Sequence, residues 1–189
     1  FLYGDVAIAG LDTPARGIPT WSMLFSALPA PSQITAASGT GYRVALAGYG
    51  GNGTGVSGTQ PIDFRRRLAE NWLGALTSLF NFEGFLFGRG DPALQQNLYF
   101  IDFDDPARGT PAASRFDFNA FRDNALPNEG TTAGGDSGGP LILTNTFSRQ
   151  LVIGVLSGGY TRFFGGQPAN GYGTVSFYQP LYLYWDWIA

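Results

Sequence analysis

Short runs of apolar and β-branched residues, separated by glycine, proline and asparagine, recur along most of the chain. Such runs predict β-strands, and the residues between them predict turns. The expected strands lie at residues 1–11, 42–47, 98–103, 141–143, 151–156 and 174–178. A glycine-rich loop or wide hairpin is expected at 48–58 and a long irregular segment at 104–128. The pattern therefore favours an all-β domain.

One segment departs from this pattern and predicts a helix. Between residues 65 and 80, apolar side chains recur at spacings of three and four, and Asp63 stands where it would cap the first turn. One face of this helix is expected to pack on the body. The aromatic stretch at 181–188 is expected to supply core and packing surface rather than a ligand platform.

Composition narrows the possible functions. Charged residues make up 13% of the chain, the net charge is −3 and the pI is about 4.7, which disfavours nucleic acid as a partner because phosphate binding needs clustered Lys and Arg. The chain has no cysteine, which excludes disulfides and thiolate zinc sites. No apolar run is long enough to span a bilayer. Histidine, the commonest general base, is also missing from the 189 residues.

Residues 134–140 read GGDSGGP and place Ser137 between glycines. A serine hydroxyl is a weak nucleophile at neutral pH, so it needs a base and a set of donors for the oxyanion that forms. The glycines permit a tight bend and leave the amides of Gly135 and Ser137 free to point at one spot, as an oxyanion hole requires. The alternative is a glycine-rich turn that happens to contain serine.

The run GGDSGGP resembles the nucleophile motif of the chymotrypsin/trypsin family of serine proteases. Further segments resemble family segments in the family's order, and they lie at residues 5–8, 47–50, 153–159 and 171–176. The resemblance implies an all-β, chymotrypsin-like double β-barrel. Residues 1–30 would complete the N-terminal barrel and the connector between barrels. Residues 31–189 would form the C-terminal barrel, with a helical insertion at about 64–129.

The same resemblance implies a role for each matching residue. Ser137 would be the nucleophile, Asp5 the carboxylate that orients a histidine, and the amides of Gly135 and Ser137 the oxyanion donors. Asp12 is the alternative to Asp5. Asp136 either pairs with a newly freed N-terminus, as in the family, or is a turn residue bonded to backbone.

The residues that match the family's primary specificity pocket carry no charge. Thr131 matches the pocket floor, and Ser157, Gly158 and Gly159 match its walls. A neutral floor disfavours arginine or lysine as the first substrate residue. It favours an uncharged residue that is apolar or small.

The general base has no candidate in this set. In the family the histidine precedes the triad aspartate by several strands, so we expect it on a separate or missing upstream segment. This chain alone is expected to be nearly inert. With that companion segment, the implied reaction is hydrolysis of a peptide bond through an acyl-enzyme, on a protein or peptide substrate and without cofactor or metal.

A narrower resemblance concerns the subgroup. Arg66, Asn71 and residues 103–105 resemble a pattern in bacterial secreted and autotransporter-type proteases. This resemblance implies an extracellular or cell-surface location.

Several alternatives stay open at this stage. The chain is also compatible with a catalytically inactive protease-fold module for binding or adhesion, with an esterase that uses the same serine, or with a structural surface protein. The G-x-G-x-x-G match at 48–53 is disfavoured as a dinucleotide site because no helix is expected to follow it. Residues 65–67 form either a solvated helical turn or an anion site, with Arg66 a candidate partner for the carboxylates at 102–105. Those carboxylates are also a candidate calcium site.

Overall fold

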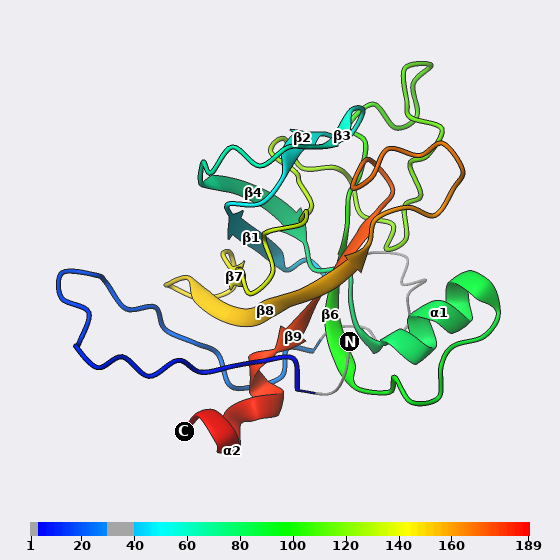
Figure 1. Ribbon diagram of the computed structural model, residues 1–189. Helices are drawn as coiled ribbons and strands as arrows, with labels where there is room; N and C mark the ends of the chain where they lie inside the picture. Colours follow the sequence, from blue (N-terminus) through cyan, green and yellow to red (C-terminus); the bar gives the residue numbers. More distant parts are fainter. Residues whose placement is uncertain (1–3, 30–39) are drawn as a thin grey trace.

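The computed structural model describes residues 4–29 and 40–189, and most of its regular structure is antiparallel β-sheet (Figure 1). The strands are β1 (Arg43–Gly48), β2 (Asn52–Thr54), β3 (Gly58–Gln60), β4 (Arg67–Trp72), β5 (Ala75–Ser78), β6 (Asn97–Asp102), β7 (Pro140–Leu143), β8 (Leu151–Tyr160) and β9 (Val175–Pro180). The helical segments are α1 (Leu79–Phe87), the 3-10 helix η1 (Leu181–Tyr184) and α2 (Trp185–Ile188). The five strands predicted beyond residue 40 are confirmed, as is the all-β, chymotrypsin-like fold class.

The large sheet closes on itself as a barrel. Its strand order is β4-β1-β7-β8-β9-β6-β5, and β4 and β5 follow each other directly in the chain. At the bend between them, the Leu73 amide donates to the Tyr42 carbonyl at 2.9 Å, and the Gly74 amide donates to the Phe100 carbonyl at 2.8 Å. One bent strand therefore joins both edges of the sheet and leaves neither unpaired.

The two faces of the sheet carry different apolar clusters, as the period of two in a strand requires. On β6, Tyr99 and Ile101 point to the barrel interior, where they meet Val44, Leu141 and Ile153 from the other strands. The alternate residues of β5, β6 and β9 face outward and are covered by α1 and by residues 118–121 (Figure 1); this outer cluster includes Ala75, Phe82, Phe100, Phe121 and Phe177.

The helix predicted at residues 65–80 is wrong. Residues 67–78 are strand, and α1 begins only at Leu79, where the Ser78 hydroxyl accepts a hydrogen bond from the Asn81 amide at 3.2 Å. Without this segment, the edges of β1 and β6 would keep unpaired backbone groups. Pairing with those edges stabilises the strand conformation more than the spacing of the apolar side chains stabilises a helix. Asp63 caps no helix: its carboxylate accepts two hydrogen bonds from the Arg67 guanidinium, each 2.7 Å long.

The N-terminal segment lies on the outside of the barrel. The strand expected at residues 1–11 is not formed over residues 4–11, which are extended, and residues 1–3 lie outside the described part. Most side chains between residues 5 and 21 are exposed. The segment pairs with β8 through Met23 and Val152 and then buries Leu28. The expected domain boundary near residue 30 also lies outside the described residues.

The C-terminal residues behave partly as expected. Leu181 is buried and the Trp185 ring packs on Phe25 with ring centroids 4.6 Å apart, but Trp185 and Trp187 stay about half exposed. None of the helices in the described ranges has the length and apolar character needed to cross a membrane.

Candidate active site

Ser137 lies in an exposed turn that joins the irregular segment to β7. Two backbone hydrogen bonds form this turn: the Asp136 amide donates to the Ala133 carbonyl at 3.1 Å, and the Gly139 amide donates to the Asp136 carbonyl at 2.9 Å. Strand β8 anchors the far side, because the Gly138 amide donates to the Leu156 carbonyl at 3.0 Å. We call residues 133–139 the nucleophile turn.

The backbone of this turn suits the role expected of its amides. Gly135 has φ = 100° and Gly138 has φ = 82°, values that favour glycine because a Cβ would be strained there. No acceptor among the described residues takes a hydrogen bond from the Gly135 or Ser137 amide. Both donors are therefore available to a bound oxyanion.

Asp136 points away from the exposed side of the turn. Its Oδ1 accepts a hydrogen bond from the Gly50 amide at 2.7 Å, and its Oδ2 accepts one from the Ala133 amide at 2.9 Å. Two roles were considered for Asp136, and in the structure it is a turn residue whose carboxylate is bonded to backbone amides.

Asp5 meets the same strand that anchors the nucleophile turn. The Ser157 hydroxyl donates to Asp5 Oδ2 at 2.6 Å, and the buried Gln179 side chain donates to Ser157 Oγ at 3.3 Å. Ser157 follows directly after Leu156, the residue bonded to the turn. Its hydroxyl thus holds the Asp5 carboxylate. Asp12, the alternative to Asp5, is exposed and accepts no hydrogen bond within the described residues.

The residues predicted to form the specificity pocket are partly brought together. Thr131 and Ser176 place their hydroxyl oxygens 2.9 Å apart, and Thr132 and Ser176 place theirs 2.8 Å apart. Across the sheet, Gly159 pairs with Ser176 and Gly158 pairs with Phe177. The three neutral hydroxyl groups of Thr131, Thr132 and Ser176 thus lie together, and Ser176 pairs with the glycine backbone of β8.

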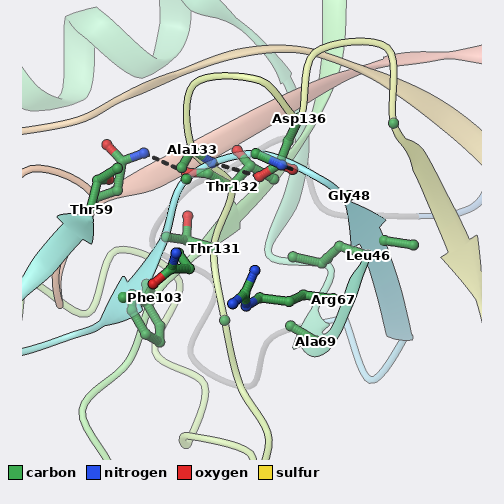
Figure 2. A pocket seen from close by; sticks show the side chains of 18 of the residues that line it. Leu46, Gly48, Thr59, Arg67, Ala69, Phe103, Thr131, Thr132, Ala133 and Asp136 are labelled. Atoms are coloured by element: carbon green, nitrogen blue, oxygen red, sulfur yellow. Dashed lines mark hydrogen bonds between the residues drawn. The ribbon is translucent and has the colours of Figure 1, made fainter. Parts of the chain in front are cut away.

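A cavity of about 340 Å³ lies behind the nucleophile turn. Its lining includes Thr131, Thr132 and Asp136 but not Ser137. Figure 2 shows Asp136 and Ala133 together on one side of this cavity and Arg67 reaching into it from another. The hydrogen bond from Arg67 lowers the pKa of the Asp63 carboxyl.

A cluster of buried acids holds the irregular segment at 104–128 against the barrel. Arg108 is its cation: the guanidinium pairs with Asp104 and donates to Asp117 at 2.5 Å. Arg66, the partner expected from the sequence, is exposed. The Asp102 carboxylate accepts the amides of the segment at 120–121 instead.

These contacts argue against a calcium site at residues 102–105, because the carboxylates there already have donors from within the chain. No group of three or more Asp or Glu side chains is arranged to hold a metal ion in the part of the chain that the structure describes. Burial raises the pKa of Asp123 to about 6 and that of Asp102 well above its ordinary value.

Glu129 ties this segment to the residues that precede the nucleophile turn. Its Oε1 accepts from the Asp104 amide at 2.6 Å and its Oε2 accepts from the Leu126 amide at 2.7 Å. The two amides lower its pKa, but burial has the larger effect and raises it to about 8. Asn71 completes the link, since its side-chain amide donates to the carbonyls of Asp102 and Gly130.

Sequence reasoning missed three residues of this site, Gln179, Arg108 and Gly50. Gln179 lies one residue beyond the strand predicted at 174–178, and Arg108 lies in a segment without periodicity. Gly50 was noted only as part of a glycine-rich strand end. A buried polar residue between apolar neighbours on a strand, as at Gln179, was the available signal.

Comparison with known proteins adds one finding. The family model described as Trypsin matches residues 117–188, which include the nucleophile turn and strands β7, β8 and β9. No curated protein matches the chain. The match supports a chymotrypsin/trypsin-like family and, with it, a serine protease-type function acting on a peptide substrate.

Proposed function

We propose that this chain carries the nucleophile side of a serine endopeptidase, with Ser137 as nucleophile and Asp5 as the carboxylate that orients a histidine. The observation that carries the proposal is that the nucleophile turn and Asp5 both bond to strand β8. Leu156 binds the nucleophile turn, and the next residue, Ser157, binds Asp5. Two segments more than a hundred residues apart in sequence are thus joined to adjacent positions of one strand.

The general base of this mechanism comes from a companion segment, because the 189 residues contain no histidine. That histidine would take the Ser137 proton as the hydroxyl attacks the substrate carbonyl, and would return it to the leaving amine. The Gly135 and Ser137 amides stabilise the oxyanion, and Asp5 holds the imidazole and stabilises its charged form. Water then hydrolyses the acyl-enzyme by the same route.

The proposed substrate is a protein or peptide with an uncharged first residue. Thr131, Thr132 and Ser176 bring hydroxyl groups and no carboxylate to the expected pocket floor. A cationic side chain would lose its hydration there without gaining a counter-charge.

The proposal extends to the setting of the protein. Residues 1–30 would complete an N-terminal barrel together with the companion segment, and residues 31–189 would form the C-terminal barrel. The exposed apolar side chains of Ile8, Leu11 and Ile18 support this assignment, because a packed barrel would bury them. We place the protein outside the cell or on the cell surface, in a bacterial secreted or autotransporter-type group, on the resemblance of Arg66, Asn71 and residues 103–105.

The experiment is fluorophosphonate labelling of the protein together with its upstream segment, with Ser137→Ala as control and intact denatured masses read before and after. We expect one phosphonyl adduct on this chain and none on the alanine variant. Absence of labelling with the upstream segment present would refute the endopeptidase proposal. Matched ester and amide substrates then separate a peptidase from an esterase, since an esterase cleaves the ester alone.

One observation favours a second candidate. A chain without histidine is also what a protease fold that has lost catalysis and serves in binding or adhesion would show. This candidate predicts that the upstream segment lacks a histidine as well, so sequencing that segment decides between the two.

A further inference from the structure

The end of strand β1 and the nucleophile turn are bonded to each other at two places. The Gly51 amide donates to the Gly134 carbonyl at 3.0 Å, and the Gly50 amide donates to Asp136 Oδ1 at 2.7 Å. Gly50 is buried, and a buried amide needs a hydrogen-bond acceptor. The carboxylate is the acceptor that this amide needs.

Two glycines leave the space that the Asp136 side chain occupies. A Cβ built on Gly50 would stand 2.6 Å from Asp136 Oδ1 and 2.8 Å from the Asp136 backbone nitrogen. A Cβ built on Gly48 would fall on the same carboxylate. Neither position has a positive φ, so close approach, not backbone conformation, is what requires glycine there. We call Gly48 and Gly50 the glycine slot.

The slot acts on the reactive part of the turn through Asp136. Asp136 immediately precedes Ser137, and its other oxygen accepts the Ala133 amide at 2.9 Å, which closes the turn from inside. A shift of this side chain would move the Asp136 backbone, and with it the following peptide unit, which carries the Ser137 amide. An oxyanion hole depends on the placement of such donors to within a few tenths of an ångström.

We infer that Gly48 and Gly50 are positioning residues for the nucleophile, because their slot holds the Asp136 carboxylate and thereby sets the Ser137 turn. The inference rests on the proposed function for its catalytic consequence, but the slot itself can be tested without catalysis.

The catalytic test uses the protein together with its upstream segment and compares Gly50→Ala with Gly84→Ala. A Cβ at Gly84, in α1, meets nothing within 4 Å, so this control is expected to keep wild-type rates. Gly50→Ala should lower kcat for a peptide ester, and the rate of phosphonylation, by about 100-fold or more, with KM within about twofold. A kcat within threefold of wild type, or an equal loss in both variants, would overturn the inference.

A double-mutant cycle separates positioning from damage to the fold. In an Asp136→Ala background the carboxylate that a Cβ on Gly48 would meet is gone, so adding Gly48→Ala should change kcat by less than about threefold. If the losses of Gly48→Ala and Asp136→Ala instead multiply, Gly48 acts independently of Asp136 and the slot is not the reason for its effect.

Hydrogen exchange supplies the test that needs no activity. The Gly50 amide of the full chain should exchange at least about tenfold more slowly in the wild type than in Asp136→Ala, because the carboxylate is its acceptor. Equal exchange would refute the slot even if the enzyme is active. Slow exchange in a protein that never labels would uphold the slot and refute the proposed function.

Discussion

The nucleophile turn and the N-terminal segment at 4–29 both meet β8, but they are held there in different ways. The turn is bonded to β8 and to the end of β1, and it encloses the Asp136 carboxylate. The N-terminal segment makes two backbone hydrogen bonds with Val152, through Ser22 and Leu24, and one side-chain hydrogen bond at Asp5, and most of its side chains are exposed. The barrel thus holds the proposed nucleophile firmly, whereas the proposed triad carboxylate lies on a largely exposed segment.

The prediction with the largest expected effect tests whether Asp5, in the largely exposed N-terminal segment, is required for activity. In the protein with its upstream segment, Asp5→Asn should lower kcat by roughly 10³- to 10⁴-fold, because the histidine loses its orienting charge. Ser157→Ala should cost only about tenfold, since it removes one of the bonds that hold Asp5. Steady-state kinetics on a peptide ester measure both. Equal losses in Asp5→Asn and Asp12→Asn would contradict the assignment.

The next effect compares the stability of the two regions. Phe100→Ala should lower the free energy of unfolding by about 3–5 kcal/mol, because Phe100 is fully buried among rings between the sheet and α1. Ile18→Ser, in the exposed N-terminal segment, should change the free energy of the isolated chain by no more than about 0.5 kcal/mol. Urea titration gives both values, and a large loss in Ile18→Ser would show that the segment is packed after all.

The third prediction concerns Arg108, the cation that holds the irregular segment at 104–128 against the barrel. Arg108→Met should cost about 3 kcal/mol, since it leaves the almost fully buried carboxylates of Asp104 and Asp117 without a partner. The matched control is Arg67→Met, whose ion pair with Asp63 is exposed to solvent and should therefore contribute far less to the free energy of unfolding. Similar losses in both variants would mean that the buried acids are not the reason for the cost.

The smallest effect is a dependence of stability on pH. Burial raises the pKa of Glu129 from 4.5 to about 8, so the folded state binds its proton more tightly than the unfolded state does. The resulting stability is present below about pH 4.5 and is lost as the pH rises through 8. We expect the Tm to fall between pH 5 and pH 8.5 and the slope to diminish in Glu129→Gln. An unchanged slope in that variant would assign the effect to other groups.

The parts that sequence reasoning predicted well were local. The strand at 98–103 and the turn around Ser137 follow from apolar alternation and from glycine spacing, which act over a few residues. The assignments of Ser137 and Asp5 remain predictions that labelling and kinetics must test. That the nucleophile turn and Asp5 bond to adjacent residues of β8, however, is seen only in the folded structure.

The parts that failed depend on partners far away in the chain. The helix expected at 65–80 was wrong because residues 67–72 pair with β1 and residues 75–78 pair with β6, and both partner strands lie elsewhere in the sequence. Arg108 was missed because its acids come together only when the irregular segment folds back on itself. Gly50 was missed because the space for a Cβ is set by Asp136, which lies 86 residues further along.

Closure of the barrel has a consequence for the kinetics of folding. The hairpin-like pairings of β1 with β4 and of β5 with β6 span about 20 to 30 residues, whereas Val44 in β1 pairs with Leu143 in β7, about 100 residues away. The entropy of closing so long a loop delays that step, and domains dominated by such contacts fold in milliseconds to seconds. The bonds that join Gly50 and Gly51 to the nucleophile turn form at the same closure. Reactivity of Ser137 during refolding should therefore appear only in the last phase, which makes the nucleophile a reporter for completion of the barrel.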